Sequence, residues 1–495
     1  MIERIGVRTI KIPVLAKDLT QDKIETYLPT ILEIFTQNAG KIIQDYDYCF
    51  GRHGILSKER MYDDQTDINN KIVEPHLQAI VNFKCGHLLG IPKTYTQGED
   101  KNNNDIDALN KYNRDINLHT IDMDTTKWAY ATGVGYYFCQ PRGGEFDVSV
   151  QAPYEVFCLD SNTCAKVYSS YIGNVPLFDI IVTSITELDK NGTKQKYFIM
   201  DIYTADMFYE YKIRSSDYGK YDLVRQEPRP VYKFLPLVER YFNSDRLGLV
   251  AFGRSLNDAL DKISSDSLDN LEETVNQILV FLNCSIGKDQ DEKKKNLQSF
   301  RKNGAIEIAS GNPQLPADIK TITNKLLNSD INVLRENLIT VLYDSTGTPR
   351  ASSIATSGGD TQGARELGNG WENSQIMTRA EIAVFSKSDK ELLERMLFIC
   401  KMTKGCLVDK INVSDVEIKY NYGMHNNIQV KSQAFGTFIT NGVPSEVAIN
   451  WCQLDNDAHT IGALIDSNRD KLGLNAPKSN QPQVSKEIIE TEEKQ

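Results

Sequence analysis

The chain has 495 residues, a hydrophobic fraction of 40% and a formal net charge of −11 at pH 7. This length predicts about two to four domains with their own hydrophobic cores. No apolar run approaches the roughly 18 residues of a membrane span. The acidic balance argues against a protein that holds DNA tightly by neutralising its phosphates.

The cellular compartment is inferred from the N-terminal residues and from the cysteines and histidines. The start, MIERIGVRTIKIPVL, lacks the basic region, apolar run and small-residue cleavage site of a signal peptide. The nine cysteines show no metal-ligand spacing, and the six histidines form no HExxH motif. We therefore expect no metal site, and reduced thiols in a cytoplasm.

The first part of the chain predicts helices. Apolar residues recur at helical spacing over 27–43 and again over 70–89, where Gly90-Ile91-Pro92 ends the pattern. Residues 97–117 are polar and rich in asparagine and aspartate, which predicts a loop that leads into another helix. Residues 120–138 predict a helix of small residues that turns into a strand at Gly133 and Gly135.

From about residue 135 to 235 the pattern changes to strands. Alternating segments predict a β-rich region, with Asn191-Gly192 as a hairpin turn. Tyrosine is frequent here, which suits half-buried strand faces, although stacking on nucleic-acid bases is an alternative. The predicted strand segments are FDVSVQAP, EVFCLD, AKVYSSYI, FDIIVTSITEL, KYFIMDIYTADMFYEYKI and DLVRQ.

A long amphipathic helix is predicted over 255–282, because its apolar residues track a period of 3.6 and it holds no glycine or proline. Ser255 can cap its first turn. The opposite face is acidic, which indicates either a solvated surface or a face turned toward something that must not stick. The acidic residues are Asp258, Asp261, Asp266, Asp269, Glu272 and Glu273.

Residues 283–312 form a charged segment with a short strand at 305–309, and 328–343 predict a second amphipathic helix. The basic side chains of the charged segment belong to a solvated loop or contact DNA or an acidic partner. Those basic residues are Lys288, Lys293, Lys294, Lys295, Arg301 and Lys302.

Glycine and small hydroxyl residues dominate 344–363, DSTGTPRASSIATSGGDTQG, which predicts a mobile or partly ordered loop. A very long helix follows over 362–404, and Gly368 and Gly370 are candidate kinks. A strand at 414–420, helices at 429–441 and 445–453, and a disordered polar tail from residue 475 complete the chain.

The sequence holds few signs of catalysis. It has no P-loop, no dinucleotide fingerprint and no nucleophile elbow. The Ser357-Gly358-Gly359-Asp360 run follows a helix and contains no lysine, unlike a phosphate cradle. The alternatives are therefore a structural protein or, less favoured, a metal-dependent nucleic-acid enzyme in which Asp360 and other carboxylates hold the metal.

Several segments in order resemble the portal proteins of tailed double-stranded DNA bacteriophages of the siphovirus type. The resemblance covers about residues 25–460, and its strength is the order and spacing of the segments. It lacks the family's arginine near 416–422, and it has Cys49-Phe50 where a smaller polar residue is common. The segments are YDYCFGRHGI (46–55), NNKIVEPHLQAIVNFKCGHLLGIP (69–92), Ala131–Tyr136 with Pro153–Phe157, Pro236–Leu282, SGGDTQGARELGNGW (357–371) and VEIKYNYGMHNNIQVKSQ (416–433).

The resemblance implies an α+β portal fold that assembles as a ring, a dodecamer, with long helices, a β-rich wing and small clip strands. The implied regions are the wing over 1–254 (β-rich at about 135–235), a stem helix over 255–282, the clip over 283–327, a stem helix over 328–343, the tunnel loop over 344–361, the long wing helix over 362–404, the crown over 405–474 and a disordered tail over 475–495.

It also implies a function without catalysis or a cofactor. A portal ring sits at one capsid vertex of the virion, is assembled in the host cytoplasm, and passes double-stranded DNA without sequence specificity during packaging and ejection. The implied partners are the terminase large subunit, the head-tail adaptor, and the major capsid and scaffolding proteins. Another phage adaptor or baseplate protein is the structural alternative.

Within that architecture the resemblance places Arg350, Ser352, Ser353 and Ile354 in the tunnel loop nearest DNA. The acidic face of the first stem helix would keep a polyanion centred in the bore, since tight phosphate contacts would slow its movement. The clip residues Lys293, Lys294, Lys295, Arg301 and Lys302 would meet the motor and later the adaptor.

Overall fold

The structure is a computed structural model of the chain. Its description covers residues 8–59, 68–97, 104–188, 194–229, 231–275, 278–285, 289–303, 309–310, 318–322, 328–350, 370–422, 428–452, 454 and 458–471. Helices and mainly antiparallel sheets are combined, which confirms the predicted α+β class. The eight cysteines whose side chains are described are free thiols.

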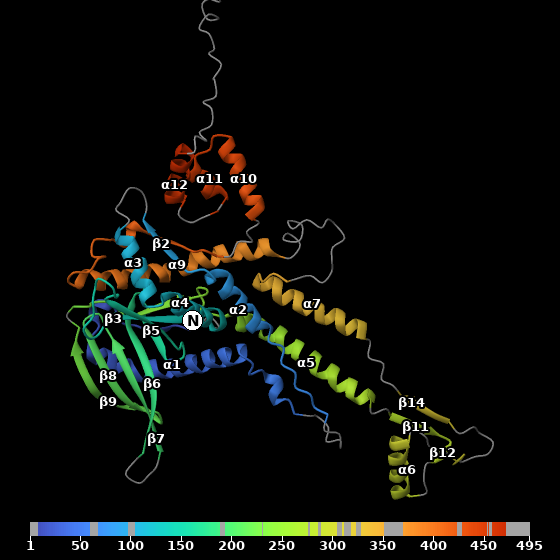
Figure 1. The fold of residues 1–495 in the computed structure, drawn as a ribbon. Coiled ribbons are helices and arrows are strands. Elements are labelled where there is room, and N and C mark those ends of the chain that lie inside the picture. Colours follow the sequence, from blue (N-terminus) through green and yellow to red (C-terminus); the bar gives the residue numbers. More distant parts are fainter. Residues whose placement is uncertain are drawn as a thin grey trace, which may run out of the picture.

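A six-stranded sheet and a long helix form one side of the molecule (Figure 1). The helix is α1 (Gln21–Cys49), capped by the Thr20 side chain, which accepts from the Lys23 amide. Its apolar face packs on the sheet, and both contribute to one buried cluster. The strand order is β1 (Ile10–Ile12), β5 (Cys164–Ser169), β6 (Pro176–Leu188), β7 (Lys194–Tyr203), β8 (Met207–Arg214) and β9 (Asp217–Pro228).

The predicted strands of this region are mostly present, with three differences. KYFIMDIYTADMFYEYKI is two strands, β7 and β8, which turn at 204–206. The strand predicted at 146–153 is wrong, because Asp147 accepts from the amide and hydroxyl of Ser149 and so stabilises a turn. Asn191-Gly192 lies outside the described residues, although Leu188 and Lys194 on either side are paired. Tyr211 is fully buried against α1, as expected for strand-face tyrosines.

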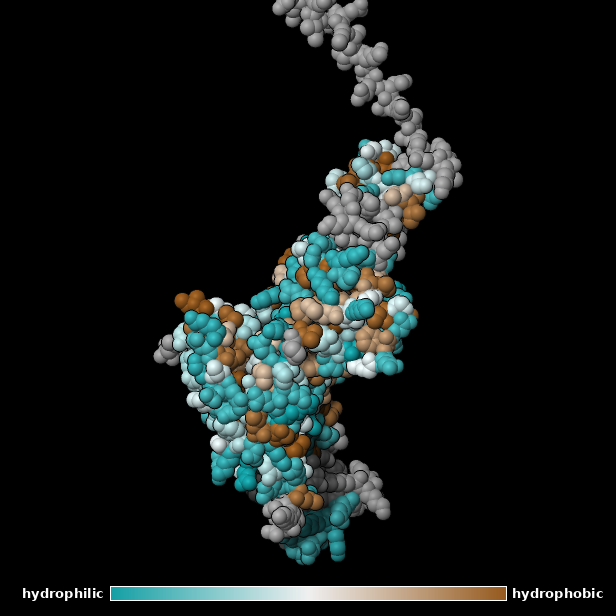
Figure 2. Space-filling model, turned by 90° about the vertical axis from the view of Figure 1, so that its left-hand side faces the viewer, coloured by the Kyte–Doolittle hydropathy of each residue, from teal (hydrophilic) through white to brown (hydrophobic). Residues whose placement is uncertain are grey.

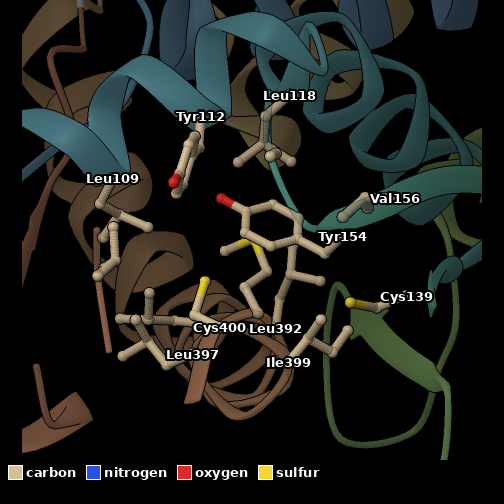
Figure 3. Close-up of a cluster of buried hydrophobic side chains, with 14 of the residues drawn as sticks. Leu109, Tyr112, Leu118, Cys139, Tyr154, Val156, Leu392, Leu397, Ile399 and Cys400 are labelled. Carbon is tan, nitrogen blue, oxygen red and sulfur yellow. The ribbon is translucent and has the colours of Figure 1, made fainter. Parts of the chain in front are cut away.

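A three-stranded sheet joins the first sheet to the helical part, in the order β10 (Leu237–Tyr241), β3 (Val134–Pro141) and β4 (Tyr154–Leu159). It packs with α3 (Asn104–Asp115), α4 (Leu118–Thr132) and α9 (Trp371–Met402). Figure 3 shows Tyr112 and Tyr154 pointing into the same core as Leu392 and Cys400 of α9. Segments that are far apart in the sequence therefore share one hydrophobic core.

Two glycines let the chain cross itself just before the helix α5 (Leu249–Val275). Gly133, with φ of +96°, ends α4, and a Cβ there would lie 2.2 Å from the Arg246 carbonyl oxygen. A Cβ on Gly248 would lie 2.1 Å from the Ala131 carbonyl oxygen. Only glycine permits this approach of two backbones. The crossing fixes the point from which the next helix, α5, leaves the body.

Two helices, α5 (Leu249–Val275) and α7 (Asn328–Thr346), run side by side away from the body (Figure 1). At their far end lie α6 (Gln290–Asn303) and two short ladders. The ladders pair β11 (Ile278–Leu282) with β14 (Asp318–Ile322), and β12 (Cys284–Ser285) with β13 (Ala309–Ser310).

The predicted helix over 255–282 is thus wrong at both ends. It begins earlier, at Leu249, and its last five predicted residues form the strand β11. The run Ile278–Leu282 is rich in β-branched and aromatic residues and gains a full set of partners on β14. Of the strand predicted at 305–309, only Ala309 is described, and it lies in β13.

Other helix boundaries differ for local reasons. The helix predicted over 70–89 is α2 (His76–Leu89), because Pro75 stands at its N-cap and residues 68–75 are not helical. The long helix predicted over 362–404 is described from Trp371 as α9, and Gly370 lies at its N-cap with φ of +78°. Gly368 and residues 362–369 lie outside the described residues.

The last part of the chain rises on the opposite side from α6 (Figure 1). β15 (Val416–Lys419) pairs with β2 (Thr94–Gln97), and α10 (Ile428–Thr440), α11 (Ser445–Cys452) and α12 (Ala458–Lys471) follow. The helix α12 was not predicted. The predicted tail at 475–495 lies outside the described residues. Three short turns of 3₁₀ helix complete the elements: η1 (Ala16–Asp18), η2 (Gly54–Ser57) and η3 (Val413–Asp415).

A buried ionic network holds the body together around Asp389 of α9. Its Oδ1 lies 2.7 Å from Nη1 of Arg240 on β10 and 2.8 Å from Nζ of Lys93, and the Tyr420 hydroxyl donates to Oδ2. Lys93 also lies 3.0 Å from Asp122 of α4. Burial opposes ionisation of Asp389, but Arg240 and Lys93 hold the pKa of its carboxyl below the usual range. The two carboxylates and two cations balance one another.

A second buried carboxylate is less well balanced. Asp179 of β6 accepts from the Leu237 amide at 2.7 Å, but its other oxygen lies 4.0 Å from Lys166, which pairs more closely with Glu391 at 3.0 Å. Burial raises the pKa of Asp179 to about 7 from 3.8. Asp179 is therefore a site where pH changes the stability of the contact between the two sheets.

We predict that Asp179→Asn stabilises the chain more at high pH than at low pH. The unfolded chain ionises Asp179 near pH 4 and the folded chain near pH 7, so the wild-type free energy of unfolding falls between these values and is level above them. The free energy of unfolding of the variant, measured relative to that of wild type, should therefore rise by about 2 to 3 kcal/mol from about pH 5 to about pH 8. Urea unfolding at both pH values measures this.

Asp206→Asn is the control, because that side chain is 69% exposed and pairs only with exposed Lys233. A difference between Asp179→Asn and wild type that is the same at both pH values would contradict the prediction.

Candidate functional site

The α5 and α7 pair, with the segments at its two ends, is the candidate functional site. Leu260 of α5 and Ile339 and Leu342 of α7 are buried in one cluster with α2. A Cβ on Gly253 would lie 2.6 Å from Leu77 and 3.0 Å from Leu342, so α2, α5 and α7 meet without space for a side chain there. The two long helices are therefore packed tightly against the body where they meet α2.

Asp261 was predicted to lie on the exposed acidic face of α5, and this prediction is wrong. This carboxylate is fully buried: Oδ2 lies 2.5 Å from Nδ1 of His53, and Oδ1 accepts from the Glu74 amide at 2.8 Å. Helical spacing placed it among exposed acids, but a segment about 200 residues earlier in the sequence covers it. Asp261 therefore joins His53 and Glu74 to α5 and is not part of an exposed face.

The other predicted carboxylates of α5 differ in how many hydrogen bonds and ion pairs they form within the chain. Asp258 accepts from the Tyr48 hydroxyl at 2.6 Å, Asp266 lies 2.6 Å from Lys58 Nζ, and Asp269 accepts from the Asn70 amide at 2.7 Å. The Asp266 side chain is still 43% exposed. Glu272 is half-buried, and the side chain of Glu273 lies outside the description. The face is acidic but partly neutralised by its own chain.

Glu74 joins the two long helices, a role that no motif or periodicity around it indicates. Its carboxylate accepts from the Ser264 hydroxyl on α5, from Nη2 of Arg335 on α7 at 2.7 Å, and from His76 at 2.6 Å. Burial alone would raise the pKa of Glu74, but the hydrogen bonds from His76, Ser264 and Arg335 lower it to about 2. The partners on α5 and α7 are 190 and 261 residues away, so local pattern could not reveal the contact.

The described residues on either side of 351–369 lie close together. Thr346 and Thr348 are buried, and Gly347, with φ of +64°, packs so closely on α9 that a Cβ would lie 2.2 Å from the Met377 sulfur. On the return, a Cβ on Gly370 would lie 3.9 Å from the Pro349 Cα. Residues 351–369 therefore leave and re-enter the fold at a narrow neck, which we define as Thr346–Pro349 with Gly370.

Arg350 stands at this neck. Its Nη2 lies 2.7 Å from Glu336 of α7, and its side chain is 38% exposed. The pair is exposed enough to be weak and exchangeable. The other residues predicted to lie nearest DNA, Ser352, Ser353 and Ile354, are outside the described residues, and so is Asp360.

The predicted basic cluster lies on α6, at the far end of the long helices (Figure 1). The helix begins next to Asp289, whose Oδ1 accepts from the Glu292 amide at 2.8 Å. Lys293, Lys294 and Lys295 are exposed on its first turns. Arg301 and Lys302 belong to the same helix, and their side chains lie outside the description. The charged segment is thus a helix and not the loop expected by default.

The described residues hold no cluster of three or more His, Cys, Asp or Glu side chains that could bind a metal ion. A search of the same residues finds no helix that is long and apolar enough to cross a bilayer. Figure 2 shows a face that is mostly hydrophilic, with separate small hydrophobic patches.

We predict that Glu74→Gln loosens α7 from α5. The native pKa is lowered, so the charged hydrogen bonds stabilise the fold above about pH 4.5 and are lost as the pH falls toward 2. The free energy of unfolding should drop by about 2 kcal/mol at neutral pH and by less at acid pH. Denaturant unfolding measures this, and amide exchange in α7 should become faster.

The exposed Glu145 supplies a matched control, Glu145→Gln, which should leave both measurements unchanged. Equal stability of wild type and Glu74→Gln at neutral pH would contradict the assigned role.

Comparison with known proteins gives the family. The family model described as phage portal protein, SPP1 Gp6-like, matches residues 29–471, which include α2, the α5 and α7 pair, the neck and α9. No curated protein matches the chain. The match spans nearly the whole sequence and agrees with the resemblance described above. The chain therefore belongs to the SPP1 Gp6-like family of phage portal proteins.

Proposed function

We propose that this chain forms the ring at one vertex of a bacteriophage capsid through which double-stranded DNA is packaged and ejected. The observation that carries the proposal is the family match over residues 29–471, together with two long helices that project from the body. The family is structural, and we assign the chain a structural role as a conduit. A separate terminase hydrolyses ATP for the movement of DNA.

Exposed apolar side chains support assembly into a ring, which we infer to be a dodecamer. A single chain leaves large hydrophobic residues more than half exposed on α5, α7 and α9, and burial of each would contribute about 1.5 to 3 kcal/mol. Neighbouring copies are the surfaces that can cover them all at once, because a ring repeats the same contact around an axis. These residues are Phe252, Leu271, Val333, Leu334, Val341 and Ile376.

Charge supports free passage of DNA. The net charge is −11, and α5 carries Asp258, which is exposed, and Asp266 and Glu272, which are partly exposed. A bore of this sign repels a polyanion and keeps it away from the wall. Arg350 and the segment after it, with Ser352, Ser353 and Ile354, give a repeated and weak hold, since Arg350 must leave Glu336 to meet a phosphate.

The small unit around α6 supports docking of partners. It lies farthest from the body and presents Lys293, Lys294 and Lys295 to solvent. We propose that it contacts the terminase large subunit during packaging and the head-tail adaptor afterwards. The body then contacts the major capsid and scaffolding proteins during assembly in the host cytoplasm, and the finished ring stays in the virion.

Electron microscopy of the purified chain tests the assembly. We expect wide rings with a central hole in negative stain. A chain that stays monomeric at every concentration, with α5 and α7 folded against its own body, would contradict the proposal.

The second experiment replaces residues 351–369 by Gly-Ser-Gly. Because Pro349 and Gly370 already meet, a short linker should close the neck without moving α7 or α9. We expect intact rings that enter capsids but do not package DNA, measured as protected DNA per particle. Normal packaging by this variant would show that the loop is not needed for the passage of DNA.

A further inference from the structure

A cleft of about 310 Å³ lies away from the long helices, between the end of α1, α2, α4 and the end of β4. Every residue that lines it lies within the described part of the chain. No role in the conduit accounts for it. Its walls combine aromatic rings with carboxylates.

The aromatic wall is built in layers. The Tyr46 ring stacks on the Trp128 ring with centroids 3.9 Å apart and an angle of 20° between the planes. The Phe50 ring centroid lies 4.7 Å from that of Tyr46, with the planes tilted by 44°, and Phe50 is 36% exposed. Stacking fixes the orientation of these rings, so the wall is rigid before anything binds. Aromatic faces and edges of this kind attract cations and planar guanidinium groups.

The charged wall is unbalanced. Asp124 and Asp160 both line the cleft, and Lys127 lies 3.4 Å from one Asp124 oxygen. No described side chain pairs with the exposed carboxylate of Asp160. Burial raises the pKa of the Tyr46 hydroxyl, and the charges of Asp160 and Asp124, which line the same cleft, raise it further. The cleft therefore holds one more negative charge than its own lysine balances.

We propose that this cleft binds the basic side chain, arginine or lysine, of a neighbouring copy of the chain. A guanidinium or ammonium group would pair with Asp160 while its stem lies along Tyr46 and Phe50. This inference rests on the proposed ring, in which each copy offers one face to one neighbour and a different face to the other. A negatively charged aromatic cleft on one face takes a basic side chain from the opposite face of the next copy.

The first test measures the chemistry of the cleft on dispersed chains. The sequence has three tryptophans, so Trp371→Phe with Trp451→Phe leaves Trp128 as the only reporter. N-acetylarginine amide should change Trp128 fluorescence in a saturable way, whereas neutral N-acetylcitrulline amide should not. Asp160→Asn should weaken the response about five- to tenfold. Equal responses to the two compounds, or to arginine amide with and without Asp160, would overturn the proposal.

The second test identifies the source of the basic group. Sedimentation velocity should show that Asp160→Asn raises the concentration needed for half-assembly about five- to tenfold, while Asp206→Asn, an exposed carboxylate elsewhere, leaves it unchanged. Identical assembly of the two variants would overturn the assignment to a neighbouring copy. If no rings form at all, the proposed function fails, but the fluorescence test still decides whether the cleft binds a cation.

Discussion

The position of Asp389 determines how the parts of this chain are held together. One buried carboxylate on α9 meets a cation from β10, a cation from the segment after α2 and a hydroxyl from the segment after β15. A buried charge of this kind is stable only when its partners stay in place, because removal of one leaves another without compensation. The network therefore fixes the positions of several elements at once.

The α5 and α7 pair differs from the body in how much of its apolar surface is buried within one copy of the chain. The sheet and α1 form a closed core, and the clusters around Tyr154 and Leu260 close the rest. The α5 and α7 pair has a core only where it meets α2 and leaves large apolar side chains exposed along its length. A single copy thus has a closed body and a pair of helices that leaves apolar side chains exposed. This division suits the proposed ring, because the body can fold before any contact between copies exists.

Local pattern predicted the elements well and their partners poorly. Periodicity located α1, α7, α9 and most strands, since these depend on residues near one another in the sequence. The strand β11 was missed because Ile278–Leu282 has an apolar pattern that continues a helix equally well, and its partner β14 lies about 40 residues later. The buried state of Asp261 and the role of Glu74 depend on contacts with distant segments, which no periodic signal carries. The tunnel-loop residues after Arg350 stay predictions.

The neck at Pro349 and Gly370 has an evolutionary consequence. A segment that starts and ends at the same point can gain or lose residues without displacing its supports, because the entropy of closing a loop changes slowly with its length. Related chains are thus free to vary this segment in length and composition while α7 and α9 keep their geometry. In the proposed ring, changes confined to this segment would adapt the passage to a different genome while the rest of the architecture is inherited unchanged.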